Sequence, residues 1–181
     1  MLTKWVAATG ISCVLATILV RVSQRTDTWV PRTSAADVSA GRLVLTLNAD
    51  TAVHGWTRWS RPRLVVECDP EQGVHLSMTT GIPVETESGS TRTVSLQFDD
   101  EDPVIAQWIP SSDRQTLRAP APAAPALVAR FSHARRFSFA FLPLRADPVV
   151  ARFSVSGFAR HWGAAPPNCA HGRLLGPPSV S

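Results

Sequence analysis

Alternating apolar and polar residues recur along the chain and predict a series of short β-strands. The clearest segment is Arg61–Cys68, in which Leu64, Val66 and Cys68 point to one side and Glu67 to the other. Because Cys68 shares the side of its apolar neighbours, we expect it to be buried. The same alternation predicts further strands at 43–47, 74–78, 94–98, 105–109, 137–141 and 151–155.

Helical spacing is rare in this sequence. Apolar residues predict one short helix over 126–134 and a final helical turn over 158–162, and the Pro/Ala run at 119–125 predicts an extended surface loop. Short strands separated by turn signals indicate a mainly β domain over residues 41–170. We expect an antiparallel β-sandwich, or a partly open barrel, with one or two short helices.

The first 22 residues are typical of a membrane-targeting segment. Residues 5–20 carry no charge, and at a helical rise they would span about 24 Å. This run is long for a signal peptide, and Arg21 follows it in place of a cleavage site. We therefore expect a signal anchor within 1–22, with a cleaved signal peptide as the alternative. Residues 23–40 then form a linker, and 171–181 a disordered tail.

Two lines of reasoning disagree on the compartment. Three arginines follow the apolar run and only Lys4 precedes it, which by the positive-inside rule would leave the domain in the cytoplasm. Cys68 and Cys169, in contrast, form an even pair outside the apolar run, which favours a disulfide in an exported protein; the alternative is two unconnected thiols. We give the cysteines more weight and expect an inner-membrane anchor with the domain in the periplasm, or a soluble periplasmic domain after cleavage.

Charge and motifs exclude several function classes. The net charge of +4 comes from arginines scattered along the chain, which predicts no nucleic-acid partner. There is no Gly-x-Ser-x-Gly, Ser-x-x-Lys or phosphate-binding loop, and the five histidines lack metal-ligand spacing. The acidic run Asp99–Asp102 lacks the spacing of a calcium loop and is typical of a solvated hairpin tip. We expect no catalytic residues, no metal and no cofactor.

Tryptophans are the remaining candidates for a binding surface. Trp56 and Trp59 lie in a polar loop, where they either form an aromatic contact surface or cap the core. Trp108 lies in the predicted strand 105–109. The candidate contact surface is therefore Trp56, Trp59 and Trp108.

Several short motifs follow one another in order along the chain. They are Arg61-Pro-x-Leu-Val-Val-x-Cys68, Leu96-x-Phe98-Asp99, Gln107-Trp108 followed by Ser112-Asp113, the strand end Phe139–Pro143, and Ala151-x-Phe153-x-Val155-x-Gly157-Phe158 before Cys169. This ordered set resembles the type VI secretion-associated VasI/TagO family. The chain departs from the family at Glu67, where the family usually has a basic residue, at Leu144, where it often has Tyr, and at the run 119–125, which looks inserted.

The resemblance implies a small exported accessory protein of a secretion machine, with no defined catalytic activity. We expect its partners to be envelope or secretion-complex proteins, contacted through a sheet edge or the Trp56/Trp59 loop, and the inner membrane, contacted through residues 5–20. The alternative is a cell-envelope module that binds peptidoglycan or sugar on its tryptophans. An envelope hydrolase is a further alternative.

Overall fold

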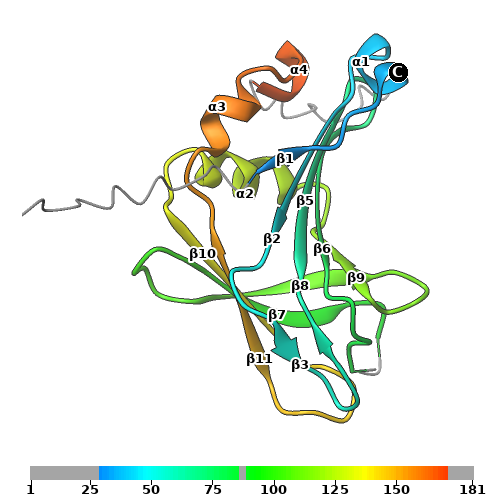
Figure 1. Ribbon diagram of the computed structural model, residues 1–181, viewed down its shortest axis with the longest axis vertical. Coiled ribbons are helices and arrows are strands. Elements are labelled where there is room, and N and C mark those ends of the chain that lie inside the picture. Colours follow the sequence, from blue (N-terminus) through cyan, green and yellow to red (C-terminus); the bar gives the residue numbers. More distant parts are fainter. Residues whose placement is uncertain (1–28, 86–88, 171–181) are drawn as a thin grey trace, which may run out of the picture.

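The computed structural model describes residues 29–85 and 89–170 (Figure 1). One antiparallel sheet of nine strands, in the order β1-β2-β5-β6-β9-β8-β7-β10-β11, curls into a half-barrel. Two further strands, β3 (Val53–His54) and β4 (Trp59–Ser60), form a separate hairpin. The strands of the large sheet are β1 (Val30–Pro31), β2 (Leu43–Asn48), β5 (Arg63–Asp69), β6 (Gly73–Thr79), β7 (Arg92–Phe98), β8 (Val104–Pro110), β9 (Thr116–Arg118), β10 (Arg136–Phe141) and β11 (Val149–Ser154).

The strands form where every second side chain can be buried on the concave side of the sheet. In β5 the residues Leu64, Val66 and Cys68 are all buried, and β10 buries Phe137 and Phe141 in the same rhythm. Phenylalanines from neighbouring strands then pack against one another, as Phe137 does against Phe98 on β7, with ring centroids 4.8 Å apart. The core is therefore one aromatic-rich layer inside the curl.

The described part of the chain also contains four short helices. They are α1 (Ala35–Ser39), α2 (Ala124–Phe131), α3 (Phe158–Trp162) and α4 (Pro167–Ala170). A proline stands in the first turn of α2, where its missing N–H costs nothing. Gly157 precedes α3 at φ 86°, a left-handed conformation that suits glycine, and the chain turns there from β11 into the helix. Both α2 and α3 lie at one end of the half-barrel (Figure 1), and their Phe131 and Phe158 close it with rings 5.6 Å apart.

The two outer strands of the curled sheet are joined by specific contacts. The backbone N–H of Asp50, just beyond β2, donates to the carbonyl oxygen of Arg152 on β11 at 2.7 Å. The Ser154 hydroxyl donates to the Asp50 carboxylate at 3.1 Å. Next to this contact, the indole N–H of Trp29 donates to the Val155 carbonyl at 3.1 Å. These bonds join the segments that flank β1 and β2 to the last strand, β11.

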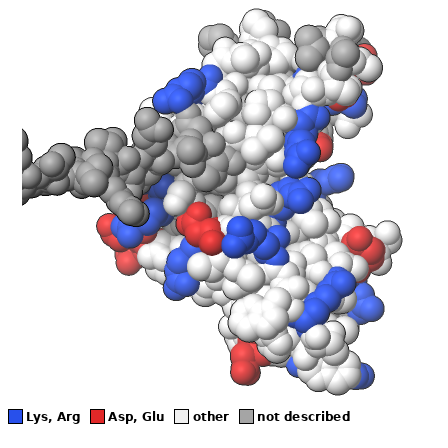
Figure 2. All heavy atoms as spheres, in the orientation of Figure 1, with Lys and Arg blue, Asp and Glu red and all other residues white. Residues whose placement is uncertain are grey.

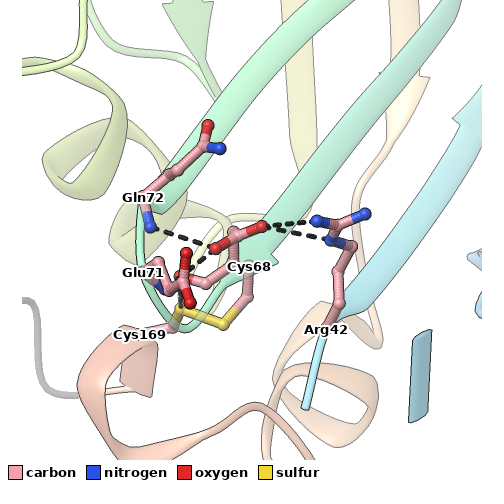
Figure 3. The surroundings of a disulfide bond; sticks show 6 residues. Arg42, Cys68, Glu71, Gln72 and Cys169 are labelled. Atoms are coloured by element: carbon pink, nitrogen blue, oxygen red, sulfur yellow. Dashed lines mark hydrogen bonds and ion pairs between the residues drawn. A yellow bond between two sulfur atoms is a disulfide. The ribbon is translucent and has the colours of Figure 1, made fainter. Parts of the chain in front are cut away.

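A disulfide fastens the C-terminal helices to the sheet (Figure 3). It joins Cys68 on β5 to Cys169 in α4, across 101 positions, and both residues are buried. Beside it, the Asp69 carboxylate accepts the backbone N–H groups of Glu71 and Gln72 at 2.8 and 3.0 Å and pairs with Arg42 at 2.7 Å. The predicted disulfide is confirmed.

The mainly β class is confirmed, and nine of the eleven strands in the described residues form a single curled sheet. The linker predicted over 23–40 is wrong from Trp29 onward, because Trp29 is buried in the core and β1 pairs with β2. The predicted anchor or signal within 1–22, the linker residues before Trp29 and the predicted tail over 171–181 lie outside the described residues. Within residues 29–85 and 89–170, no helix combines the length and apolar character needed to span a bilayer.

Candidate contact surface

The β3–β4 hairpin carries two large aromatic side chains that are exposed to solvent. Trp56 is 61% exposed and Trp59 is 69% exposed. The strands pair through Val53 with Ser60 and His54 with Trp59, so that Trp56 lies in the tight connection between them. The interpretation that these tryptophans cap the core is therefore wrong, and both are open to a partner.

One bond closes the turn of this hairpin, and three further bonds hold the hairpin on the sheet. The Gly55 N–H donates to the Arg58 carbonyl at 2.9 Å and closes the turn. The Arg58 guanidinium donates to the Gly81 carbonyl and, at 2.8 Å, to the Gln115 side chain. The Ser60 hydroxyl donates to the Thr80 carbonyl at 2.8 Å. These bonds fix the position of the hairpin backbone that carries the exposed rings. Less conformational entropy is therefore lost when a partner binds the rings.

Glycine at position 81 is required for this seating. Gly81 has φ +68°, and a Cβ there would lie 2.2 Å from the Ser60 hydroxyl oxygen. A side chain at this position would force the Ser60 hydroxyl to move and so break its bond to the Thr80 carbonyl, since real Cβ atoms do not approach so closely. The loop after β6 is therefore shaped to receive the hairpin.

Polar and cationic groups border both exposed rings. The His54 ring packs against Trp59 with centroids 4.8 Å apart. The Arg145 guanidinium carbon lies 5.2 Å from the Trp56 ring centroid, within cation–π range. A shallow pocket of about 90 Å³ lies beside Trp56 and is bordered by Pro83, Pro143 and Leu144. Its size suits one apolar side chain or one sugar ring.

Trp108 does not belong to this surface. It has no exposed area and packs edge-on against Phe139, with ring centroids 4.9 Å apart. In β8 it shares the concave side with Val104 and Ala106 and pairs with Arg92 of β7. The prediction that Trp108 is a contact residue is wrong, because the curl of the sheet turns that side inward.

The acidic run binds protein groups within the fold. The Asp99 carboxylate accepts the backbone N–H groups of Arg135 and Arg136 at 2.9 and 2.8 Å, and these bonds lower the pKa of Asp99. Asp100 pairs with Arg136 at 2.8 Å, and Glu101 pairs with Arg130. Across the described ranges, no three His, Cys, Asp or Glu side chains come together as a metal-binding group.

Charge is spread widely over the face seen in Figure 2. Lys and Arg side chains lie in several separate groups, with acidic side chains among them. This face therefore offers no single charged patch that would select a highly charged ligand.

Sequence reasoning missed the residues that support the hairpin. Gly81 and Arg145 come from segments distant from the hairpin, and only the fold brings them to it. Arg58 directly precedes Trp59, but its bonds to Gly81 and Gln115 also depend on the fold. A weak signal was present in Gly55, since a glycine in a polar stretch marks a tight turn. Comparison with protein-family models, with curated proteins and with solved structures found no match.

Proposed function

We propose that this protein is a non-catalytic binding domain whose β3–β4 hairpin contacts another protein. One observation carries the proposal: two large aromatic side chains stand more than half exposed on a hairpin that is tightly bonded to the sheet. Exposure of such large apolar rings to water is unfavourable, and burial against a partner would remove this cost. Tryptophan is also enriched among the residues that contribute most of the binding energy at protein interfaces. The pocket beside Trp56 would receive an apolar side chain of the partner.

The proposed setting is the periplasmic side of an inner membrane. The Cys68–Cys169 disulfide supports an oxidising compartment, because such bonds persist outside the cytosol. Residues 5–20 would then anchor the chain, or be removed as part of a signal peptide. In line with the VasI/TagO-like motifs, the partner would be a component of a secretion machine or another envelope protein.

A second candidate function is binding of a cell-envelope sugar or peptidoglycan fragment. The pocket of about 90 Å³ beside Trp56 favours it, since a sugar ring can stack on an exposed indole. Arg145 lies over the same ring and could pair with a carboxylate of a muropeptide.

Affinity purification of the tagged full chain from its host tests the proposal. We expect a protein partner to be recovered with the unchanged chain and lost with the double variant Trp56→Ala/Trp59→Ala. Val30→Ala is the control, because Val30 is 44% exposed on β1 and lies outside the hairpin. Equal recovery with the double variant contradicts the proposal.

Two further outcomes separate the alternatives. If calorimetry of the full chain detects muropeptide binding that the double variant loses, and no protein is recovered, the sugar-binding function replaces the first. If the purified chain degrades cell-wall material, both non-catalytic functions are wrong.

A further inference from the structure

One edge of β8 has no neighbouring strand along much of its length. On one side β8 pairs with β7 from Val104 to Trp108. On the other side β9 pairs only with Ile109 and Pro110. The chain then turns away, since the Ala119 N–H donates to the Leu76 carbonyl on β6 at 2.9 Å. The sheet therefore divides here, and the first part of β8 becomes an open edge.

The backbone direction at this edge follows from the pairing with β9. The Ser111 N–H donates to the Thr116 carbonyl at 2.8 Å, so Ser111 faces β9. Because backbone direction alternates along a strand, Ile109, Gln107 and Ile105 face the same way. Beyond the end of β9, the N–H and C=O groups of Ile105 and Gln107 point out of the sheet. Within the described chain, none of these backbone groups has a hydrogen-bond partner.

Between Pro103 and Pro110, this edge carries neither the charges nor the prolines that usually prevent strand pairing. Val104, Ile105 and Ile109 are 54%, 65% and 46% exposed. No charged residue lies between Asp102 and Asp113. Natural edge strands are normally protected by charges, prolines or bulges, so an uncharged apolar edge of this kind is suited to pairing with another strand.

We propose that β8 pairs antiparallel with β8 of a second copy of this chain. Ala106 would lie on the two-fold axis, so that Ile105 of each copy faces Gln107 of the other. The four outward backbone groups of each copy would then form four hydrogen bonds across the axis. The small Ala106 side chain allows close approach, and the two Ile105 side chains meet diagonally on the outer face.

Charge favours a second copy as the occupant. β9 lies on the same side of β8 as the open part, and Arg118 is the last residue of β9. A partner strand that pairs antiparallel with the open part of β8 would therefore begin beside Arg118. That strand needs an acidic residue just before it, and in this chain Asp102 precedes β8. Arg118 and Asp102 have no ion-pair partner within the described chain. In the symmetric dimer, Asp102 of each copy would pair with Arg118 of the other copy, so that this ion pair would occur twice.

Such a contact predicts a weak dimer, because one strand pair buries less surface than a standard interface of about 1,600 Å². Native mass spectrometry of the full chain, released from detergent over a concentration series, counts the copies. We expect the dimer fraction to rise with concentration. A single copy at every concentration overturns the proposal.

Two variants at one position test the backbone contact. Gln107→Pro removes the outward backbone N–H but breaks no backbone hydrogen bond to β7, because that N–H points away from β7. Gln107→Ala keeps the outward N–H. Both lose the side-chain bonds of Gln107 to Thr91 and Thr93. We expect Gln107→Ala to dimerise and Gln107→Pro to remain a single copy, with equal circular dichroism. Equal dimerisation of the two folded variants contradicts the proposal.

Exchange of charge tests the orientation. Asp102→Arg and Arg118→Asp should each lower the dimer fraction, and the double variant should restore it. A dimer that survives both single variants unchanged would place the contact elsewhere and overturn the assignment. Failure of this test leaves the hairpin proposal untouched, since the two surfaces share no residue.

Discussion

The indole N–H of Trp29 donates to the carbonyl oxygen of Val155, 126 positions later, at 3.1 Å. Trp29 directly precedes β1 and Val155 directly follows β11, so this bond joins the two edges of the curled sheet. Its ring also packs against Phe131 and Phe158, with centroid distances of 6.1 and 5.0 Å. One side chain near the beginning of the domain thus holds together elements from its end.

Trp29→Phe should destabilise the domain. It leaves the buried Val155 carbonyl without its donor, which costs about 1–3 kcal/mol in the free energy of unfolding. Chemical denaturation followed by circular dichroism measures this loss. Trp59→Ala is the control and should change stability by less than about 0.5 kcal/mol, because Trp59 is exposed. Equal effects of the two variants would contradict the role of Trp29.

Reduction of the disulfide should lower stability by about 4–5 kcal/mol, as loop-closure entropy predicts for a closed loop of this length. Denaturation with and without dithiothreitol measures the difference. The double variant Cys68→Ala/Cys169→Ala should be as unstable as the reduced chain and should not respond to dithiothreitol. If reduction leaves the midpoint unchanged, the bond does not hold α4 to the sheet.

Stability should fall in acid partly through Asp69. Bonds from the Gln72 and Glu71 backbone N–H groups, and then from Arg42, lower the pKa of Asp69. A lowered pKa in the folded state stabilises the fold above the unfolded-state pKa of about 3.9, and this stabilisation is lost as the pH falls through the folded-state pKa. Asp69→Asn should therefore be less stable than the unchanged chain at pH 7, with a gap that narrows below about pH 4. A constant gap from pH 7 to pH 2 would contradict this.

Strands with one buried side could be predicted, because burial imposes a two-residue period on the sequence. The alternation over Phe137–Phe141 predicted a strand, and these residues lie within β10 in the structure. The period cannot be detected in β1, β3 or β4, each of which has two residues. Their positions depend on partners distant in the sequence, such as Val155 for the segment that begins at Trp29.

The candidate surface was harder to predict than the fold. Trp56, Trp59 and Trp108 share the same chemistry, and only the curl of the sheet separates the two exposed rings from the buried one. Both faces of β8 carry apolar residues, because Ile105 and Ile109 point to the face away from Trp108. The alternation of the sequence therefore could not show which face of β8 is buried.

Loss of the Arg58 side chain should weaken binding more than stability. Arg58 holds the hairpin through the Gly81 carbonyl and the Gln115 side chain, so Arg58→Ala would free the hairpin without opening the core. We expect partner recovery to fall several-fold with a stability change below about 1 kcal/mol. The control is Arg61→Ala, an exposed arginine just beyond the hairpin. Unchanged recovery with Arg58→Ala would mean that hairpin rigidity does not matter.

Photo-cross-linking in the living host tests the binding surface most directly. A photoreactive phenylalanine analogue replaces Trp56, Trp59 or, as a control on the outer face of β7, Gln97 in the full chain. We predict that positions 56 and 59 trap the same protein partner and that position 97 does not trap it. Adducts at position 97 alone, or no adduct at 56 and 59, would contradict the hairpin as the contact surface.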